Sequence, residues 1–523
     1  MLLSVYFFFG LLVLWIQSFV GVVGSLSWLS YGLLGDTLLS VMFDEVSSVG
    51  LFMLFCCGSI ALYYCHHYFG GSLEGVLLFP LIVWFLGVMG ILMVSSSLLF
   101  SLFFWEYLGI VSFFLILFYS NMSSLRASLI TLFASRFGDV SIFLLIMCVS
   151  CWCQVSSVLY VVLFLLVVLT KSACYPFVSW LLEAMRAPTP VSSLVHSSTL
   201  VAAGVWFTFR YSYLGDLLVW DILVWFSIVT VFITAVSAVF FMDLKKIVAL
   251  STCNNVSWCL LFYISGDLEL ALLQLLTHGV CKCYLFMSVG DLMSQSGSSQ
   301  SAVGVYISRY SGCYLLLVQG FLVFSLCGLP FLGVFFSKHG LFAGVLYGGN
   351  VGLWWMYVIG LFLSYVYSVR FCLLLSCSGG GLSNGYSSFF LLVCPLVFLG
   401  TGLNYFWSVW SSECCSLSFF WSLGILVVQV GGCLLGGFLY YSVMGGGSWF
   451  SLLCGVEGYV SAVYSMFLWV SSVCILSFYR WEVYLLSGWS LFIRSLVVFR
   501  TSAFSLNVVV LGLLFLLWFS FVV

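Results

Sequence analysis

Long apolar runs, separated by short polar or glycine-rich stretches, make up most of this chain. The runs reach about 20 residues, which is the length that an α-helix needs to cross a hydrocarbon core of ~30 Å. Strict alternation of apolar and polar positions, which is typical of a membrane β-barrel, is absent from the sequence. The pattern therefore predicts an all-α polytopic membrane protein with about fifteen transmembrane helices.

The expected helices can be assigned to residue ranges. A first helix at 1–24 is followed by a mixed segment, 25–43, which we expect to form a loop or hairpin. A polar loop at 294–301 divides the helices that follow into two groups, at 46–64, 76–96, 98–119, 127–150, 156–182, 191–213, 217–241, 244–264 and 268–292, and at 311–343, 350–376, 389–409 and 418–442. Residues 450–497 mix charges with apolar runs and fit either another crossing or a long helix on the membrane surface. Residues 505–523 form an apolar anchor.

Prolines interrupt two of these helices, at Pro176 and at Pro330. A proline removes a backbone donor and breaks the helix, and breaks at membrane depth are tolerated where they line a cavity or are buried in protein. Paired broken helices are typical of transporters built from inverted repeats. We therefore expect two five-helix halves, 76–213 and 217–376, with the broken helix fourth in each.

Composition supports a membrane location and narrows the partners. Hydrophobic residues make up 64% of the chain and charged residues 6%, whereas soluble domains carry roughly 25% charged residues. The net charge of −2 gives no indication of a nucleic-acid partner or of a polybasic membrane contact. The inflated Phe and Gly counts, beside scarce Pro and His, favour a strand-biased genome such as a mitochondrial one. The 21 cysteines lack zinc-site spacing and are expected to act as packing residues.

All five lysines lie within or at the edge of apolar segments. They are Lys171, Lys245, Lys246, Lys282 and Lys338. An ionisable group inside a bilayer costs about 2.5 kcal/mol or more, and it usually faces a bundle interior or water. Five lysines in such positions indicate a function rather than an accident of sequence.

Acids and histidines accompany these lysines. Glu106 has apolar residues on both sides, and Arg136 and Asp139 share a helix face at i,i+3 spacing. His278 is one turn before Lys282, and His196 lies among hydroxyl residues. Taken singly, Arg136–Asp139 also fits a structural pair and His196 a hydrogen-bonded interior histidine.

As a set, these groups favour a proton or cation route through the bilayer. Burial favours the neutral form of a lysine, and a nearby carboxylate favours its charged form. Movement of a carboxylate partner would therefore load or unload the lysine. The sequence contains no haem-type CxxCH, no cluster of cysteine ligands and no Gly-rich dinucleotide loop, so we expect no redox site.

Seven stretches, in order along the chain, resemble one family. They are WEYLGIVSF, SRFGD, TKSACYPFVSWLLEAMRAPTPVSSLVHSSTLVAAG, DLKKIVALSTCNNV, THGVCKCYLFMSVG, LPFLGVFFSK and YSVR. Together they resemble the antiporter-like subunit family of respiratory complex I over roughly residues 44–370. The additional length after residue 400 resembles that of the distal proton-pumping member of the family.

The resemblance implies roles for particular residues. Glu106 and Lys171 would form the carboxylate–lysine pair of the first half-channel, and Arg136 and Asp139 would modulate that pair. His196 would link the two halves of the chain. The central polar axis and the exit half-channel would then be formed by Lys246 (or Lys245), His278, Lys282 and Lys338.

The resemblance also implies a domain organisation. The N-terminal helices and hairpin would occupy 1–75, and the two proton half-channels would occupy 76–213 and 217–376. Additional transmembrane helices would follow at 377–449. A lateral amphipathic helix at 450–500 would brace the neighbouring antiporter-like subunit, and an anchor helix at 503–523 would end the chain.

The same resemblance implies a location and partners. The chain would lie in the mitochondrial inner membrane among the other membrane-arm subunits of complex I, in contact with lipid. It would bind no cofactor itself, because NADH, FMN, iron–sulfur clusters and ubiquinone would belong to other subunits.

Some positions depart from the family pattern. Gln274 stands where a histidine is frequent, His339 where an aspartate is usual after the lysine, and Cys174 where a glutamine is usual. Only one helix precedes the segment 25–43, where the family normally has two, so we expect fifteen crossings instead of sixteen.

Two other functions remain open at this point. The chain could be a subunit of a multisubunit sodium/proton antiporter, which shares these motifs. It could also be a structural brace without conduction of its own, although the density of intramembrane charges argues against that.

Overall fold

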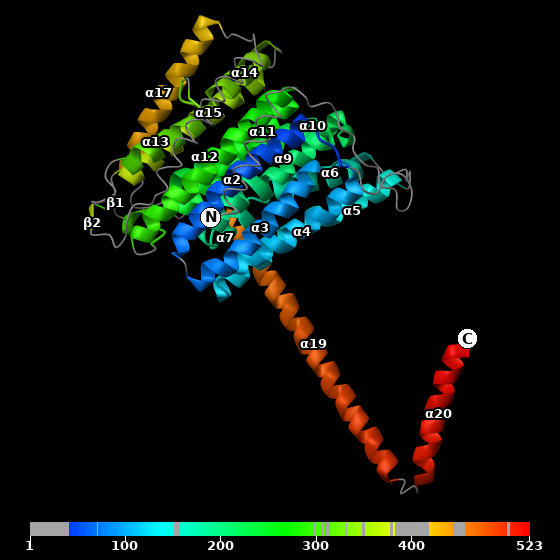
Figure 1. Cartoon of the computed structure of the whole chain (residues 1–523). Coiled ribbons are helices and arrows are strands. Elements are labelled where there is room, and N and C mark those ends of the chain that lie inside the picture. The colour runs from blue at the N-terminus through cyan, green and yellow to red at the C-terminus, as the bar shows by residue number, and fades with distance from the viewer. Residues whose placement is uncertain are drawn as a thin grey trace. The chain divides into compact units, whose positions relative to one another are not determined.

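The computed structural model describes residues 41–522 apart from 71, 151–156, 297–298, 306, 309–313, 331, 348–350, 377–379, 382–417, 443–455 and 499–502. It confirms the predicted all-α membrane fold (Figure 1). Ten helices in the described part are long and apolar enough to cross a membrane, and two shorter apolar helices accompany them. The helices predicted at 1–24 and 389–409, and most of the segment 25–43, lie outside the described residues.

The first group of five predicted helices has the expected order. Its elements are α3 (Leu73–Val94), α4 (Leu98–Leu117), α5 (Met122–Ser150), α6 (Ser157–Lys171) with α7 (Ser179–Ala184), and α8 (Thr189–Leu194) with η1 (Val195–Thr199) and α9 (Leu200–Arg210). The fourth member is broken between α6 and α7, as Pro176 predicts. The fifth contains a π-helical turn, η1, which the sequence pattern did not predict.

The second group repeats this order. Its elements are α10 (Leu217–Phe240), α11 (Leu244–Ile264), α12 (Leu268–Gln295), α13 (Tyr314–Cys327) with α14 (Phe335–Tyr347), and α15 (Val351–Ser376). The break between α13 and α14 again falls in the fourth member, around Pro330. Five crossings are an odd number, so a second set that follows the first starts on the opposite side of the membrane. The exact domain limits stay predictions.

Further helices and several short elements complete the described chain. Helix α2 (Glu45–Phe69) precedes the first group, and α17 (Phe419–Ser442), α19 (Val456–Val498) and α20 (Ala503–Val522) follow the second. The short elements are η2 (Ser212–Leu214), η3 (Ala302–Gly304), β1 (Ile307–Ser308) and β2 (Gly380–Gly381). Strands β1 and β2 pair in parallel. Residues 1–458 and 459–523 form two separate compact units.

One end of the first unit is held by an ion pair. Asp44 caps α2, because its Oδ1 accepts from the backbone nitrogen of Ser47 at 3.0 Å. The same carboxylate pairs with Arg210 at the end of α9. Arg210 also donates to the carbonyl oxygens of Met42 and Met93, at 3.3 and 3.4 Å. This arginine therefore ties the start of α2 and the end of α3 to α9.

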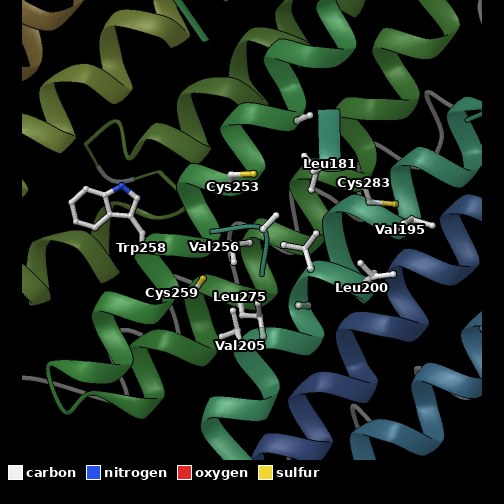
Figure 2. Close-up of a cluster of buried hydrophobic side chains, with 14 of the residues drawn as sticks. Leu181, Val195, Leu200, Val205, Cys253, Val256, Trp258, Cys259, Leu275 and Cys283 are labelled. Atoms are coloured by element: carbon white, nitrogen blue, oxygen red, sulfur yellow. The ribbon is translucent and has the colours of Figure 1, made fainter. Parts of the chain in front are cut away.

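The core of the first unit lies where α9, α11 and α12 meet the short helices after the first break. Figure 2 shows part of it, with Val205 of α9, Val256 of α11 and Leu275 of α12 in one buried cluster. Gly204 of α9 lies against the backbone just after Lys171, since a Cβ at this position would be 2.6 Å from the nitrogen of Ser172. Close approach at a glycine thus places α9 directly behind the first break.

Candidate functional site

A row of four charges crosses α4, α5 and α6. Helix α5 packs against both α4 and α6 (Figure 1). Arg136 of α5 pairs with Glu106 of α4, and its Nη1 is 3.4 Å from Oδ2 of Asp139. Oδ1 of Asp139 is in turn 3.8 Å from Nζ of Lys171 at the end of α6. The row Glu106–Arg136–Asp139–Lys171 therefore alternates in sign along its length.

The row runs from a partly exposed end to a buried end. The side chains of Glu106 and Arg136 are 34% and 40% exposed, whereas those of Asp139 and Lys171 are 2% and 1% exposed. Nζ of Lys171 also lies 5.2 Å from the ring centroid of Trp105, within cation–π distance. A charge on Lys171 is thus stabilised by a carboxylate and an aromatic face rather than by bulk water.

The predicted direct pair between Glu106 and Lys171 is replaced by a different arrangement. Asp139, not Glu106, lies within ion-pair distance of Lys171, and Glu106 pairs with Arg136. The physical reason is the position of α5 between the other two helices. Its i,i+3 pair presents both an arginine and an aspartate to the space between Glu106 and Lys171. Arg136 and Asp139, which were expected to modulate the pair, are therefore the direct ion-pair partners of Glu106 and Lys171 respectively.

A small cavity adjoins the lysine. Its lining includes Lys171 and the hydroxyl residues Ser112, Thr131, Ser135 and Thr170. It has room for on the order of one water molecule, and the hydroxyls supply the polar partners that such a water needs. At the helix break, the carbonyl of Thr170 accepts a hydrogen bond from Nε1 of Trp180 at 2.9 Å. This hydrogen bond satisfies the carbonyl directly before Lys171 at the break.

The two adjacent lysines at the start of α11 have different surroundings. Lys245 is 7% exposed and donates to the carbonyl of Ala187 at 3.3 Å. It also acts electrostatically on His196, which is fully buried in η1 with its ring centroid 6.2 Å from that of Trp180. Lys246 instead pairs with Asp243 at 3.6 Å, with its side chain 29% exposed. Lys245 is therefore the buried lysine of the two and the one that acts on His196, and its place in a proton route stays a prediction.

Helix α12 carries three polar residues one turn apart, Gln274, His278 and Lys282, all buried. Lys282 donates a hydrogen bond to Oγ of Ser251 on α11. Oε1 of Gln274 accepts from Oγ of Ser337 at 2.8 Å, directly before Lys338 in the chain. Gln274, a departure from the family pattern, therefore connects α12 with α14 through a neutral hydrogen bond.

Lys338 of α14 is buried and faces neutral groups. Its Nζ donates to the carbonyl of Cys327 at 2.9 Å and lies 5.5 Å from the ring centroid of Trp258. A second cavity is lined by Lys282, Cys327 and Ser368, among others. Cys327, the last residue of α13, thus lines the cavity beside Lys282 and also accepts the hydrogen bond of Lys338.

The other two departures have local partners. Sγ of Cys174 accepts a hydrogen bond from Oγ of Ser172 at 3.2 Å, so the thiol is satisfied within the break that follows Lys171. His339 is half-buried, with its ring centroid 5.4 Å from that of Phe335. The effect of either departure on conduction stays a prediction.

Sequence reasoning missed one pair of polar residues. His67 of α2 contacts Asp291 of α12, with Nε2 and Oδ1 3.3 Å apart. The two residues are 224 positions apart, so no spacing rule relates them. An aspartate in the apolar stretch SVGDLM was the signal that could have indicated this site.

Buried charges in a row, within a helical bundle that has two broken helices, define a class of protein that moves protons or other cations across a membrane. A family model described as the transmembrane part of NADH:quinone oxidoreductases and Mrp antiporters matches residues 95–366. The chain belongs to this family, which confirms the resemblance of its motifs.

Relatives and solved structures agree with this assignment. The chain is 30% identical over 435 residues to a protein of Aedes aegypti named NADH-ubiquinone oxidoreductase chain 5, covering 77% of this chain and 73% of the relative. It matches a chain of respiratory complex I from Thermus thermophilus with a TM-score of 0.66, 17% identity, and coverage of 83% and 95%. It matches a chain of an Mrp complex from a Dietzia species with the same TM-score, 22% identity, and coverage of 82% and 53%. These two structures show a shared fold.

Proposed function

We propose that this chain is a proton-translocating membrane subunit of NADH:ubiquinone oxidoreductase in the mitochondrial inner membrane. The name of the Aedes aegypti relative supports the assembly and the reaction. The row of alternating charges that ends at the buried Lys171 supports the proton-translocating role. In this proposal, quinone reduction in other subunits drives proton transfer along the buried groups of this one.

In the first half, Asp139 is the residue whose movement can change the proton affinity of Lys171. It lies between two cations, Arg136 at 3.4 Å and Lys171 at 3.8 Å. A shift of the carboxylate toward Arg136 weakens the attraction that holds a proton on Lys171, and a shift back restores it. Hydroxyls and water in the adjoining cavity provide acceptors for the released proton.

The second half carries the proton onward through neutral partners. His196 and Lys245 lie between the halves, and His278 and Lys282 follow on α12. From the cavity beside Lys282 and Cys327 the proposed route passes to Lys338, which donates a hydrogen bond to the carbonyl of Cys327. We assign the release of the proton to Lys338, because it is the last buried cation along this sequence of contacts.

The long helix α19 suits the predicted brace. It contains 43 residues, which is about 65 Å at 1.5 Å per residue and roughly twice the thickness of a hydrocarbon core. It is therefore too long for one upright crossing. We propose that α19 lies along the neighbouring antiporter-like subunit and that α20, with 20 residues, is the anchor.

Redox cofactors have no role in the mechanism proposed for this chain. We assign NADH, FMN, the iron–sulfur clusters and ubiquinone to other subunits of the assembly. The residues described above then only hold and pass protons, and the energy reaches them through movements of neighbouring helices.

The similarity to the Mrp complex keeps one competing function under test. A sodium/proton antiporter subunit would show proton flux that depends on sodium, without NADH. The proposed function instead requires flux that depends on NADH oxidation and that proceeds in sodium-free buffer. Vesicles containing the intact assembly distinguish the two outcomes.

The main test replaces Lys171 with methionine in the intact assembly. We expect assembly to be retained and proton transfer per NADH oxidised to fall by the share that this subunit carries, because methionine fills the site but carries no proton. Arg186→Met is the control, since Arg186 forms a partly exposed pair with Glu183. Normal proton transfer in the Lys171→Met variant would overturn the proposal.

A further inference from the structure

A second polar cluster joins α2, α8 and α12. Oδ1 of Asp291 is 3.3 Å from Nε2 of His67, and Oδ2 lies 3.5 Å from Nε2 of Gln295. The cluster lies outside the row at Lys171, and nothing in the mechanism above uses it. We infer that His67 and Asp291 form a proton-exchange site that joins the buried polar axis to the surface. This inference rests on the proposed function and adds a route to it.

The cluster lies at one end of the bundle. Helices α2 and α12 pack side by side and in parallel, because Gly279 meets Met53 and Cys283 contacts the carbonyl of Cys57. Asp291 follows Lys282 on α12 by about 14 Å at 1.5 Å per residue. Lys282 is at the middle of α12 (Leu268–Gln295) and so near mid-membrane. Because half of a hydrocarbon core measures about 15 Å, Asp291 lies near the membrane surface.

The two side chains differ in their exposure at the surface of this chain. The side chain of His67 is 35% exposed, whereas that of Asp291 is 5% exposed. An imidazole exchanges protons with water near neutral pH. In the transfer, an N–H bond of the His67 imidazolium breaks and an O–H bond forms on Asp291. His67 is then neutral and takes another proton from water.

Hydroxyl groups continue from Asp291 toward the interior. The hydroxyl of Tyr64 lies near Thr189 at the start of α8 and close enough to Asp291 to be affected by its charge. Gly290 allows this approach, because a Cβ there would be 2.9 Å from Oη of Tyr64 and from Cβ of Thr189. Gly290, the residue before Asp291, is therefore where α12 approaches both α2 and α8 closely.

Helix α8 and the π-turn complete the connection. Buried serines Ser192 and Ser193 follow Thr189 and lead to His196 in η1. Two residues before Thr189, the carbonyl of Ala187 accepts from Lys245. The serine hydroxyls donate to carbonyls of their own helix, which leaves their oxygen lone pairs to accept a proton or water. The route from His67 thus ends at the two groups between the halves.

The test uses the intact assembly in phospholipid vesicles and measures membrane potential during NADH oxidation. His67→Ala and Asp291→Asn should each lower the membrane potential by as much as Lys171→Met does, because each would remove a proton carrier from the route through this subunit. His66→Ala is the matched control, because His66 is the exposed neighbour of His67 in the same last turn of α2. The control should leave the potential unchanged.

Chemical rescue separates proton exchange from a purely structural tether. Millimolar imidazole in the bathing solution should restore the potential in His67→Ala, because a mobile carrier can occupy the exposed position. It should not restore Asp291→Asn, whose missing group is buried. Membrane potential is the readout because neutral imidazole crosses membranes and dissipates a pH gradient.

The outcomes have distinct meanings. A normal potential in His67→Ala, or a loss that imidazole does not restore, would overturn the exchange site. If Asp291→Asn fails to assemble, the exposed His67 variant still decides the question. Loss of pumping in Lys171→Met together with normal pumping in His67→Ala would leave the proposed function standing and refute only this inference.

Discussion

Two lysines, one in each half of the chain, both lie beside a tryptophan but have different polar partners. Lys171 and Lys338 each lie over a tryptophan from the second helix of their half, Trp105 and Trp258, at 5.2 and 5.5 Å. Lys171 faces the carboxylate of Asp139. Lys338 faces a backbone carbonyl. The residue after each tryptophan also differs in charge, because it is the acidic Glu106 in the first half and the neutral Cys259 in the second.

This difference suggests a division of labour between the halves. The proton affinity of Lys171 depends on charged side chains that can move, so it can respond to an external driving force. Lys282 and Lys338 are held by a hydroxyl and a backbone carbonyl, whose charge is fixed. In the proposed function, the first half is therefore the driven half, and the second conducts what it receives.

The largest expected effect comes from removing the charge that distinguishes the first half. Asp139→Asn leaves the buried Lys171 without its carboxylate, and breaking a buried ion pair costs about 3–5 kcal/mol. Thermal denaturation of the detergent-solubilised assembly should show the loss of stability, and vesicle assays should show loss of pumping. Glu183→Gln, at a partly exposed pair, is the control. Equal stability of Asp139→Asn and Glu183→Gln would show that Lys171 does not depend on the carboxylate of Asp139, and the difference between the two halves would then not hold.

A smaller loss of stability is expected when the hydroxyl of Ser251, which holds Lys282 in the second half, is removed. Ser251→Ala removes the hydrogen-bond partner of Lys282 on α11, and a hydrogen bond to a charged group contributes about 2 kcal/mol. Ser257→Ala on the same helix is the matched control, because Ser257 donates to carbonyls of α11 itself. Denaturation midpoints that do not differ between these variants would show that Lys282 is not held by Ser251.

Paired tryptophan variants sharpen the comparison further. Trp105→Phe and Trp258→Phe each remove buried volume and cost stability for that reason alone. Where the lysine carries a charge, the weaker cation–π contact of phenylalanine adds about 0.5–1 kcal/mol. The measurement is the thermal midpoint of each variant in the solubilised assembly. We expect similar costs at the two sites, and a cost at Trp105 larger by that amount would mean that Lys338 is neutral at rest.

The smallest effect is expected at Lys246, near the start of α11. Its i,i+3 pair with Asp243 is partly exposed, and such pairs contribute about 0–1 kcal/mol. Lys246→Gln should therefore leave stability and pumping nearly unchanged, whereas Lys245→Gln should reduce pumping. Proton transfer per NADH in both variants checks this, and the reverse order would reassign the central lysine to Lys246.

The helices were largely predictable because membrane thickness sets the length of each apolar run. The expected helix 244–264 coincides with α11, and prolines located both breaks. The π-turn around His196 was not predictable, since its sequence continues an ordinary helical pattern. Local spacing predicted that Arg136 and Asp139 share a face, but only packing shows that this face lies between Glu106 and Lys171. The contact of His67 with Asp291 escaped prediction for the same reason.

Gly204 has a consequence for the genetics of this chain. A side chain there would press on the backbone that follows Lys171. A single-nucleotide change from glycine to serine or alanine adds no charge and alters none of the proton-carrying groups. It would nevertheless displace the end of α6 and the lysine that ends it. An inherited variant at Gly204 would thus present as a defective pump, although every acid and base in the chain was intact.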